Sequence, residues 1–229
     1  NHGGIAAGRQ DGARARYLRL QARARAHSQT GRLSARLGRD SAFEHCAFDL
    51  GGKLVRNDLA IEIDGPGAQA AFHGLYLAGD DQHIDNHTRV DHKVGPATSE
   101  QEYRGILGGS ARCIWTGKAI VHAGADGTDA EQANHNLLLS ENAEIDAKPE
   151  LEIYADEVKC AHGTTVGQLD QNALFYLRTR GLDKHSARRL LTRAFAEAVV
   201  AMTPVEDWRE AIGEQVIGRL NDLTHGEDE

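Results

Sequence analysis

The sequence predicts a mainly β protein that ends in a small α-helical domain. Short apolar or alternating runs follow one another from about residue 15 to residue 167, and helical periodicity appears only after Gly167. A third observation, an aromatic content of 5%, favours one β architecture over the others. We therefore predict a parallel β-helix (β-solenoid) over residues 1–167 and a helical domain over residues 168–229.

The β part is expected to consist of short strands between turn residues. Gly, Asp and Asn separate the strand patterns, as is typical of turns. Strands without intervening helices fit a sandwich, a barrel or a solenoid, and the pattern alone does not decide among the three. Few aromatics are present to fill a wide sandwich, whereas small and aliphatic residues stack well in a narrow solenoid. Examples of the strand patterns are residues 59–63, 75–78, 111–115, 137–139 and 151–154.

Arginine dominates the first forty residues. They carry nine Arg against two Asp, or +7, and the net charge of the chain is −8, which leaves −15 for the rest. Tyr17 is the one aromatic within the Arg-rich run, which contains no Lys, so we predict no nucleic-acid binding. We predict instead a strand face in water that alternates at period two with apolar residues. The arginines are Arg14, Arg16, Arg19, Arg23 and Arg25, and the apolar residues are Leu18, Leu20, Ala22, Ala24 and Ala26.

Three helices are predicted after residue 167. Asp170 is placed to cap the first helix and Gly181 to end it. A second helix begins at about Asp183, and Pro204 starts a third. Both later helices have an apolar stripe, which we expect to pack on its neighbour and on the end of the β region. The same helical surface also suits the docking of another protein.

The cysteine content and the lack of a targeting signal predict the cellular compartment of the protein. Cys46, Cys113 and Cys160 are too few and too scattered for a disulfide framework, which fits a reducing cytoplasm. No run of about 18 apolar residues and no secretory signal occurs, so we expect a soluble protein without a membrane span. The chain enters strand-like sequence directly after Asn1, so we expect a fragment of a longer protein.

Cys160 and His162 form the first candidate site. In an extended segment, side chains two residues apart share a face, so the thiol and the imidazole would point the same way. These donors suit iron, an iron-sulfur unit or zinc. Two ligands make half a site, so a partner chain would have to complete it. The alternative is that Cys160 is a small apolar core residue.

His83, Asp85 and His87 form a second candidate cluster. In a strand they share one face and could bind a divalent metal or act in acid-base chemistry. We favour a hydrogen-bonded polar ladder on the β surface. The enzyme alternative is a β-helix carbohydrate lyase or esterase that uses this cluster. A hexapeptide-repeat acyltransferase would need a six-residue apolar period, which is not found.

No complete catalytic motif is present. The sequence contains no phosphate loop, no dinucleotide-binding glycine motif and no nucleophile elbow. We therefore predict that the chain is not an enzyme, and that any nucleotide hydrolysis requires another subunit.

Several segments together resemble the SufB/SufD family of iron-sulfur cluster assembly scaffold proteins. The Lys-Cys-Ala-His-Gly segment at residues 159–163 resembles the SufD branch of that family. The resemblance extends over about residues 40–222. The segments that carry it are residues 82–88, 102–107, 128–132, 136–140, 148–163 and 174–181.

The resemblance implies a right-handed parallel β-helix and a place in a complex. A SufD-like chain would pair with SufB through the β-helices, and its helical end would bind SufC, an ATP-binding-cassette ATPase. Cys160 and His162 match family positions near the SufB junction, where they would help to hold iron or a transient cluster shared with SufB. The exposed pairing edge also suits a homodimer when SufB is missing. Flavin binding stays open at this point.

Overall fold

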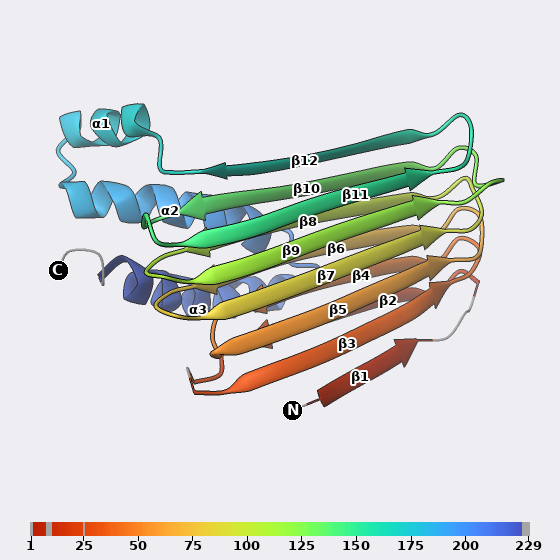
Figure 1. The fold of residues 1–229 in the computed structure, drawn as a ribbon, viewed down its shortest axis with the longest axis horizontal. Coiled ribbons are helices and arrows are strands. Elements are labelled where there is room, and N and C mark those ends of the chain that lie inside the picture. The colour runs from red at the N-terminus through yellow and green to blue at the C-terminus, as the bar shows by residue number, and fades with distance from the viewer. Residues whose placement is uncertain (1, 8–10, 25, 226–229) are drawn as a thin grey trace.

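The computed structural model contains two six-stranded parallel sheets and three helices, and it describes residues 2–7, 11–24 and 26–225 (Figure 1). Odd-numbered strands form one sheet and even-numbered strands form the other. The predicted parallel β-helix followed by helices is confirmed. The strands are β1 (His2–Ala7), β2 (Arg14–Gln21), β3 (Ser28–Leu37), β4 (Ala42–Asp49), β5 (Leu54–Ile63), β6 (Gln69–Ala78), β7 (His83–His92), β8 (Thr98–Leu107), β9 (Arg112–Val121), β10 (Asp129–Leu138), β11 (Glu144–Ile153) and β12 (Lys159–Gly167).

Each coil of the solenoid adds one strand to each sheet, and the coils stack in register. In the even-numbered sheet, Phe72 is in register with Gln101, and Gln101 with Gln132. Strand residues of one parity face the lumen between the sheets, because side chains alternate across a strand. The lumen holds the main apolar core, which includes the fully buried Trp115 and Tyr76.

Tight turns allow the coils to stack at the spacing of neighbouring strands. Gly109 has φ +60°, and a Cβ atom there would lie 2.7 Å from the backbone nitrogen of Asp80 in the preceding coil. A side chain at this position would push the two turns apart, which explains the glycine. The turn therefore keeps β8 and β9 in contact with the coil beneath them.

The three helices begin and end close to their predicted positions. They are α1 (Gln171–Thr179), α2 (Lys184–Val200) and α3 (Glu206–His225). Asp170 accepts a hydrogen bond from the backbone nitrogen of Asn172, and Asp183 caps α2 through Ser186. Gly181 follows α1 with φ +96°, a conformation that favours glycine. None of the described helices is both long and apolar enough to cross a membrane.

Helices α2 and α3 cover the carboxyl-terminal part of the outer face of the even-numbered sheet. The expected packing of the helices on each other is confirmed, because α2 contacts α3. The expectation that they cover the end of the β region is wrong: α2 packs against β6 and β8 in the middle of the sheet. The reason is a second apolar cluster, in which Phe48, Leu77 and Ile106 point outward and meet Val199 and Val216. The strands at the end of the solenoid are left uncovered by this contact.

The prediction that the arginines of the Arg-rich run face water is confirmed for Arg14, Arg16 and Arg23 and is wrong for Arg19. Arg16 is exposed and pairs with Glu44, whereas Arg19 is in register with lumen-facing Ala47 and points inward. The guanidinium of Arg19 pairs with the carboxylate of Asp49 at 2.9 Å, and the Asp49 side chain is 2% exposed. Leu18 therefore shares the outward face with Arg16, because both positions are even. Arg25 lies outside the described residues.

Candidate functional site

Cys160 and His162, here called the candidate metal pair, lie on β12, the last strand of the even-numbered sheet. Cys160 is in register with Ala130 and His162 with Gln132. Ala130 and Gln132 are 0% and 3% exposed and face the lumen, so the pair continues two lumen-facing rows. The segment is extended and the two side chains share a face, as the spacing predicts. The sheet has no described strand beyond β12, so the pair lies at the open end of the lumen.

The two members of the candidate metal pair have different surroundings. Cys160 is partly buried, and His162 is exposed. Burial raises the pKa of the Cys160 thiol, a backbone hydrogen bond at Ala130 lowers it, and the charge of Asp129 raises it further. Because metals bind the thiolate, binding at Cys160 must displace a proton. The other two cysteines are buried, and burial raises the pKa of Cys46 to about 12, so neither offers an accessible thiolate.

Two glutamine side chains lie in the lumen beneath His162. The side chains of Phe72, Gln101, Gln132 and His162 follow one another at spacings of 29, 31 and 30 residues, and we call them the lumen column. Gln101 accepts a hydrogen bond from the Thr88 hydroxyl. Both side-chain polar atoms of Gln132 are buried without a hydrogen-bond partner among the described residues. The sequence does not reveal Gln132, because the coil period varies and the partner of His162 follows only from the register.

The candidate metal pair supplies two donors of suitable chemistry. A thiolate and an imidazole bind iron and iron-sulfur units, and their position at an open strand edge leaves room for donors from another chain. Within the described residues, no group of three or more His, Cys, Asp or Glu side chains is arranged to hold a metal ion. The donor types suit a soft metal, and the amide of Gln132, which has no hydrogen-bond partner among the described residues, lies one strand beneath them.

The second candidate cluster lies on the outer face of the odd-numbered sheet. His83, Asp85 and His87 share that face of β7, as predicted. The Asp85 carboxylate accepts hydrogen bonds from Arg56 and lies 2.7 Å from Nε2 of His87. Asp85 is thus paired with Arg56 and lies beside His87, which fits the polar ladder, and the enzyme alternative is without support.

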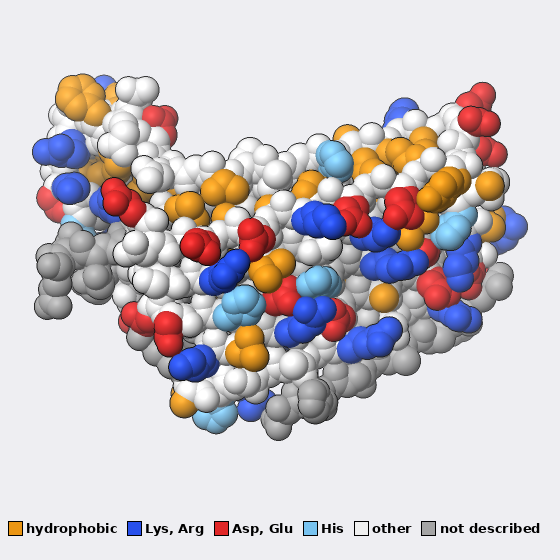
Figure 2. Space-filling view, viewed as in Figure 1, with side chains coloured by type: hydrophobic (Ala, Val, Ile, Leu, Met, Phe, Trp, Pro, Cys, Tyr) orange, Lys and Arg blue, Asp and Glu red, His pale blue; other side chains and the backbone are white. Residues whose placement is uncertain are grey.

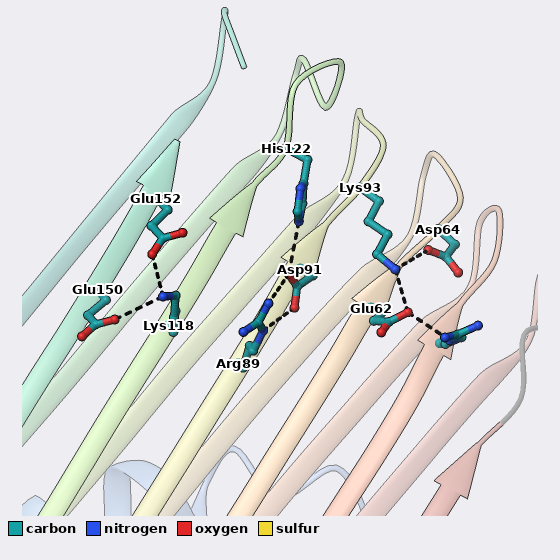
Figure 3. A network of polar contacts seen from close by, with 10 residues as sticks. Glu62, Asp64, Arg89, Asp91, Lys93, Lys118, His122, Glu150 and Glu152 are labelled. Carbon is teal, nitrogen blue, oxygen red and sulfur yellow. Dashed lines mark hydrogen bonds and ion pairs between the residues drawn. The ribbon is translucent and has the colours of Figure 1, made fainter. Parts of the chain in front are cut away.

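The same face carries further ladders of opposite charge (Figure 2). Arg89 and His122 both contact the Asp91 carboxylate, and Lys118 lies 2.6 Å from Glu152 (Figure 3). Paired charges that join neighbouring strands protect a β surface from unspecific association. The outer face of the odd-numbered sheet is therefore a solvated, internally paired surface.

The fold defines a parallel β-solenoid protein whose last strand carries the candidate metal pair at the open end of the lumen. The chain belongs to the SufBD family: residues 5–195 match the family model described as "SUF system FeS cluster assembly, SufBD core domain". The family links the chain to iron-sulfur cluster assembly. The predicted membership in the SufB/SufD family is confirmed.

Named relatives agree with this assignment. The chain is 34% identical over 186 residues to the iron-sulfur cluster assembly protein SufD of Escherichia coli, covering 81% of this chain and 43% of that protein. It is 37% identical over 186 residues to a SufBD family protein of Mycobacterium leprae, covering 78% and 47%. It is 31% identical over 207 residues to the chloroplastic protein ABCI7 of Arabidopsis thaliana, covering 89% and 43%. The chain thus spans less than half of the length of these relatives.

Proposed function

We propose that the chain is a SufD-like scaffold subunit that pairs with SufB, docks the SufC ATPase and has no catalytic residues of its own. Iron or a nascent cluster is the cargo, held where the chain meets SufB. The observation that carries this proposal is the position of the candidate metal pair on the last strand of the solenoid. Cys160 and His162 supply two donors, and SufB side chains supply the others.

The open edge of the solenoid supports pairing with SufB. β12 hydrogen-bonds to β10 on one side, and within the described chain its other side is unpaired. An unpaired strand edge is a template for association with another chain. Apolar side chains flank this edge: Ile153 is 43% exposed, Tyr154 63% and Val166 50%. Backbone pairing together with burial of these side chains would bring partner ligands next to Cys160.

The helical part supports a second docking surface. α1 projects past the β12 edge (Figure 1), and its main contact with another helix or strand is with α2. Phe175 and Tyr176 on α1 are 69% and 56% exposed. Exposed aromatics of this kind are common at protein interfaces. We assign this surface to the SufC ATPase.

Co-purification tests the proposal. The wild-type chain, His162→Ala and the control His83→Ala are each purified with cognate SufB and SufC, and iron and sulfide are measured after anaerobic reconstitution. We expect all three to form the complex and only His162→Ala to lose bound iron and sulfide. His83 is a suitable control because it lies on the outer face of the opposite sheet. Failure of the wild-type chain to form a complex overturns the proposed function.

The same edge is proposed to pair two copies of the chain when SufB is missing. Light scattering at increasing protein concentration tests this, and a monomer at the highest concentration contradicts it. Quantification of flavin in the purified complex decides whether that cofactor belongs to the assembly.

A further inference from the structure

Gln132 lies one strand beneath His162 in the lumen column. Neighbouring strands in a sheet lie about 4.8 Å apart, and in-register side chains of a parallel pair point to the same face. Gln132 is therefore the lumen-facing neighbour of His162 on the adjacent strand, although the two side chains make no hydrogen bond in the structure. Ala130, which is in register with Cys160, has no polar side chain. Of the two β10 residues beneath the candidate metal pair, Gln132 alone offers hydrogen-bonding groups.

The hydrogen bonding of Gln132 is an exception on its own strand. Asn134 and Asn136 also face the lumen from β10, and both are fully paired: Asn136 donates to Asn134 at 2.7 Å, and the Asn134 amide donates to the Tyr76 hydroxyl at 3.1 Å. The Tyr76 hydroxyl in turn donates to Asn136. Gln132 is 3% exposed, and neither its oxygen nor its nitrogen has a partner among the described residues. A buried amide without partners is unfavourable, so this one calls for a partner at the open end of the lumen.

The chemistry of metal-binding histidines identifies that partner. A histidine that binds a metal through one ring nitrogen donates the N–H of the other to an acceptor, which fixes the tautomer and the ring orientation. We propose that Gln132 is a positioning residue for the candidate metal pair, and that its Oε1 accepts this hydrogen bond from His162. Its Nε2 then donates toward the Cys160 sulfur or a bound anion. The inference rests on the proposed role of the pair as ligands.

The tautomer of His162 tests the hydrogen bond without any metal. We would record ¹⁵N NMR spectra of the chain labelled with ¹⁵N-histidine, at a pH where the imidazole is neutral, and assign His162 by its loss in His162→Ala. The wild type and Gln132→Glu are expected to show one predominant tautomer, because both keep an acceptor. Gln132→Met, which has a similar volume but no acceptor, is expected to show a mixture. An unchanged tautomer in Gln132→Met overturns the inference.

A matched control separates this effect from a general change in the lumen. Gln101→Met removes the same kind of side chain one strand deeper in the lumen column, where Gln101 bonds to Thr88. We expect it to leave the His162 tautomer as in the wild type. If Gln101→Met changed the His162 tautomer as much as Gln132→Met, the loss of any lumen amide would be enough to change it. That result would overturn the specific role of Gln132.

Titration with Co²⁺ distinguishes failure of this inference from failure of the proposed site. The thiolate-to-cobalt absorption band reports binding at Cys160. We expect Gln132→Met to weaken Co²⁺ binding by about tenfold, as for other hydrogen-bond partners of metal ligands, and Gln132→Glu to restore it. If His162→Ala weakens binding and Gln132→Met does not, the site stands and the inference falls. If His162→Ala also leaves binding unchanged, the proposed site itself falls.

Discussion

In-register positions that face the lumen have different surroundings in the central coils and on the last strand of the solenoid. Phe72, Gln101 and Gln132 in the lumen column are 0%, 1% and 3% exposed, because each has a neighbouring strand on both sides. His162 continues the column on β12, has a described neighbour on one side only, and is exposed. The same position is thus buried in the middle of the stack and exposed at its end. Four predictions test this difference, and they are ordered by expected effect.

Removal of a lumen side chain from a central coil should have the largest effect. Phe72 is fully buried and packs edge-to-face on Phe43, with ring centroids 6.3 Å apart. Phe72→Ala should lower the free energy of unfolding by about 3–5 kcal/mol, because it removes a large apolar side chain and leaves a cavity. Urea denaturation followed by circular dichroism measures this loss. A loss below about 1 kcal/mol would mean that the lumen collapses easily and is not tightly packed.

The buried histidines of the central coils should make the stability depend on pH. His92 is 0% exposed, and burial lowers its pKa to about 4, while burial lowers the pKa of His45 to about 3. A group whose pKa is lowered by folding contributes stability above its unfolded pKa, near 6.5, and this contribution is lost as the pH falls toward 4. For His92 the loss is about 3 kcal/mol.

The measurement is a series of urea denaturations between pH 7.5 and pH 4.5. His92→Gln should flatten the pH dependence, since it keeps a hydrogen-bonding group near Ser99 without a titrating ring. His162→Ala is the matched control at the exposed end of the column, and it should leave the pH dependence as in the wild type. If His92→Gln and His162→Ala flattened the pH dependence of stability equally, histidines of the central coils and of the last strand would not differ in their effect.

Much of the fold follows from local signals, and the site follows only in part. The side chains of Asp170 and Asp183 cap two helices, and the positive φ of Gly181 follows the end of α1. These signals are local, so the sequence is sufficient to place the helices. The packing of α2 on β6 and β8 depends on apolar side chains on the outer face of these strands. Both faces of the strands are buried there, so the sequence shows a continuous apolar run that does not reveal which residues face the helix. Arg19 shows the same limit: its inward position depends on its pairing with Asp49, thirty residues away.

The candidate metal pair was predictable because both residues lie on one strand. The i, i+2 spacing fixes their common face without knowledge of the coil. Gln132 was not predictable, because its relation to His162 arises between strands. The spacing of neighbours in the lumen column changes from 29 to 31 to 30 residues, so no fixed period in the sequence aligns them.

Loss of the α2 cap should affect the central coils more than the last strand. The Asp183 carboxylate accepts a hydrogen bond from the backbone nitrogen of Ser186 at 2.9 Å. Asp183→Ala should cost about 1 kcal/mol of stability. Since α2 packs on β6 and β8, hydrogen exchange should accelerate in those strands while β12 stays unchanged. Faster exchange in β12 alone would contradict the assignment of α2 as the cover of the central strands.

Substitution at the last strand should have the smallest effect on stability. His162→Ala should change the free energy of unfolding by no more than about 0.5 kcal/mol, because an exposed side chain at a strand edge loses little packing. Gln101→Ala, at the equivalent position in a central coil, should cost more, since it breaks the bond to Thr88 and leaves a cavity. Urea denaturation of both variants gives the two values. If His162→Ala proved as costly as Gln101→Ala, His162 would be a structural residue, and its use as a ligand would compete with folding.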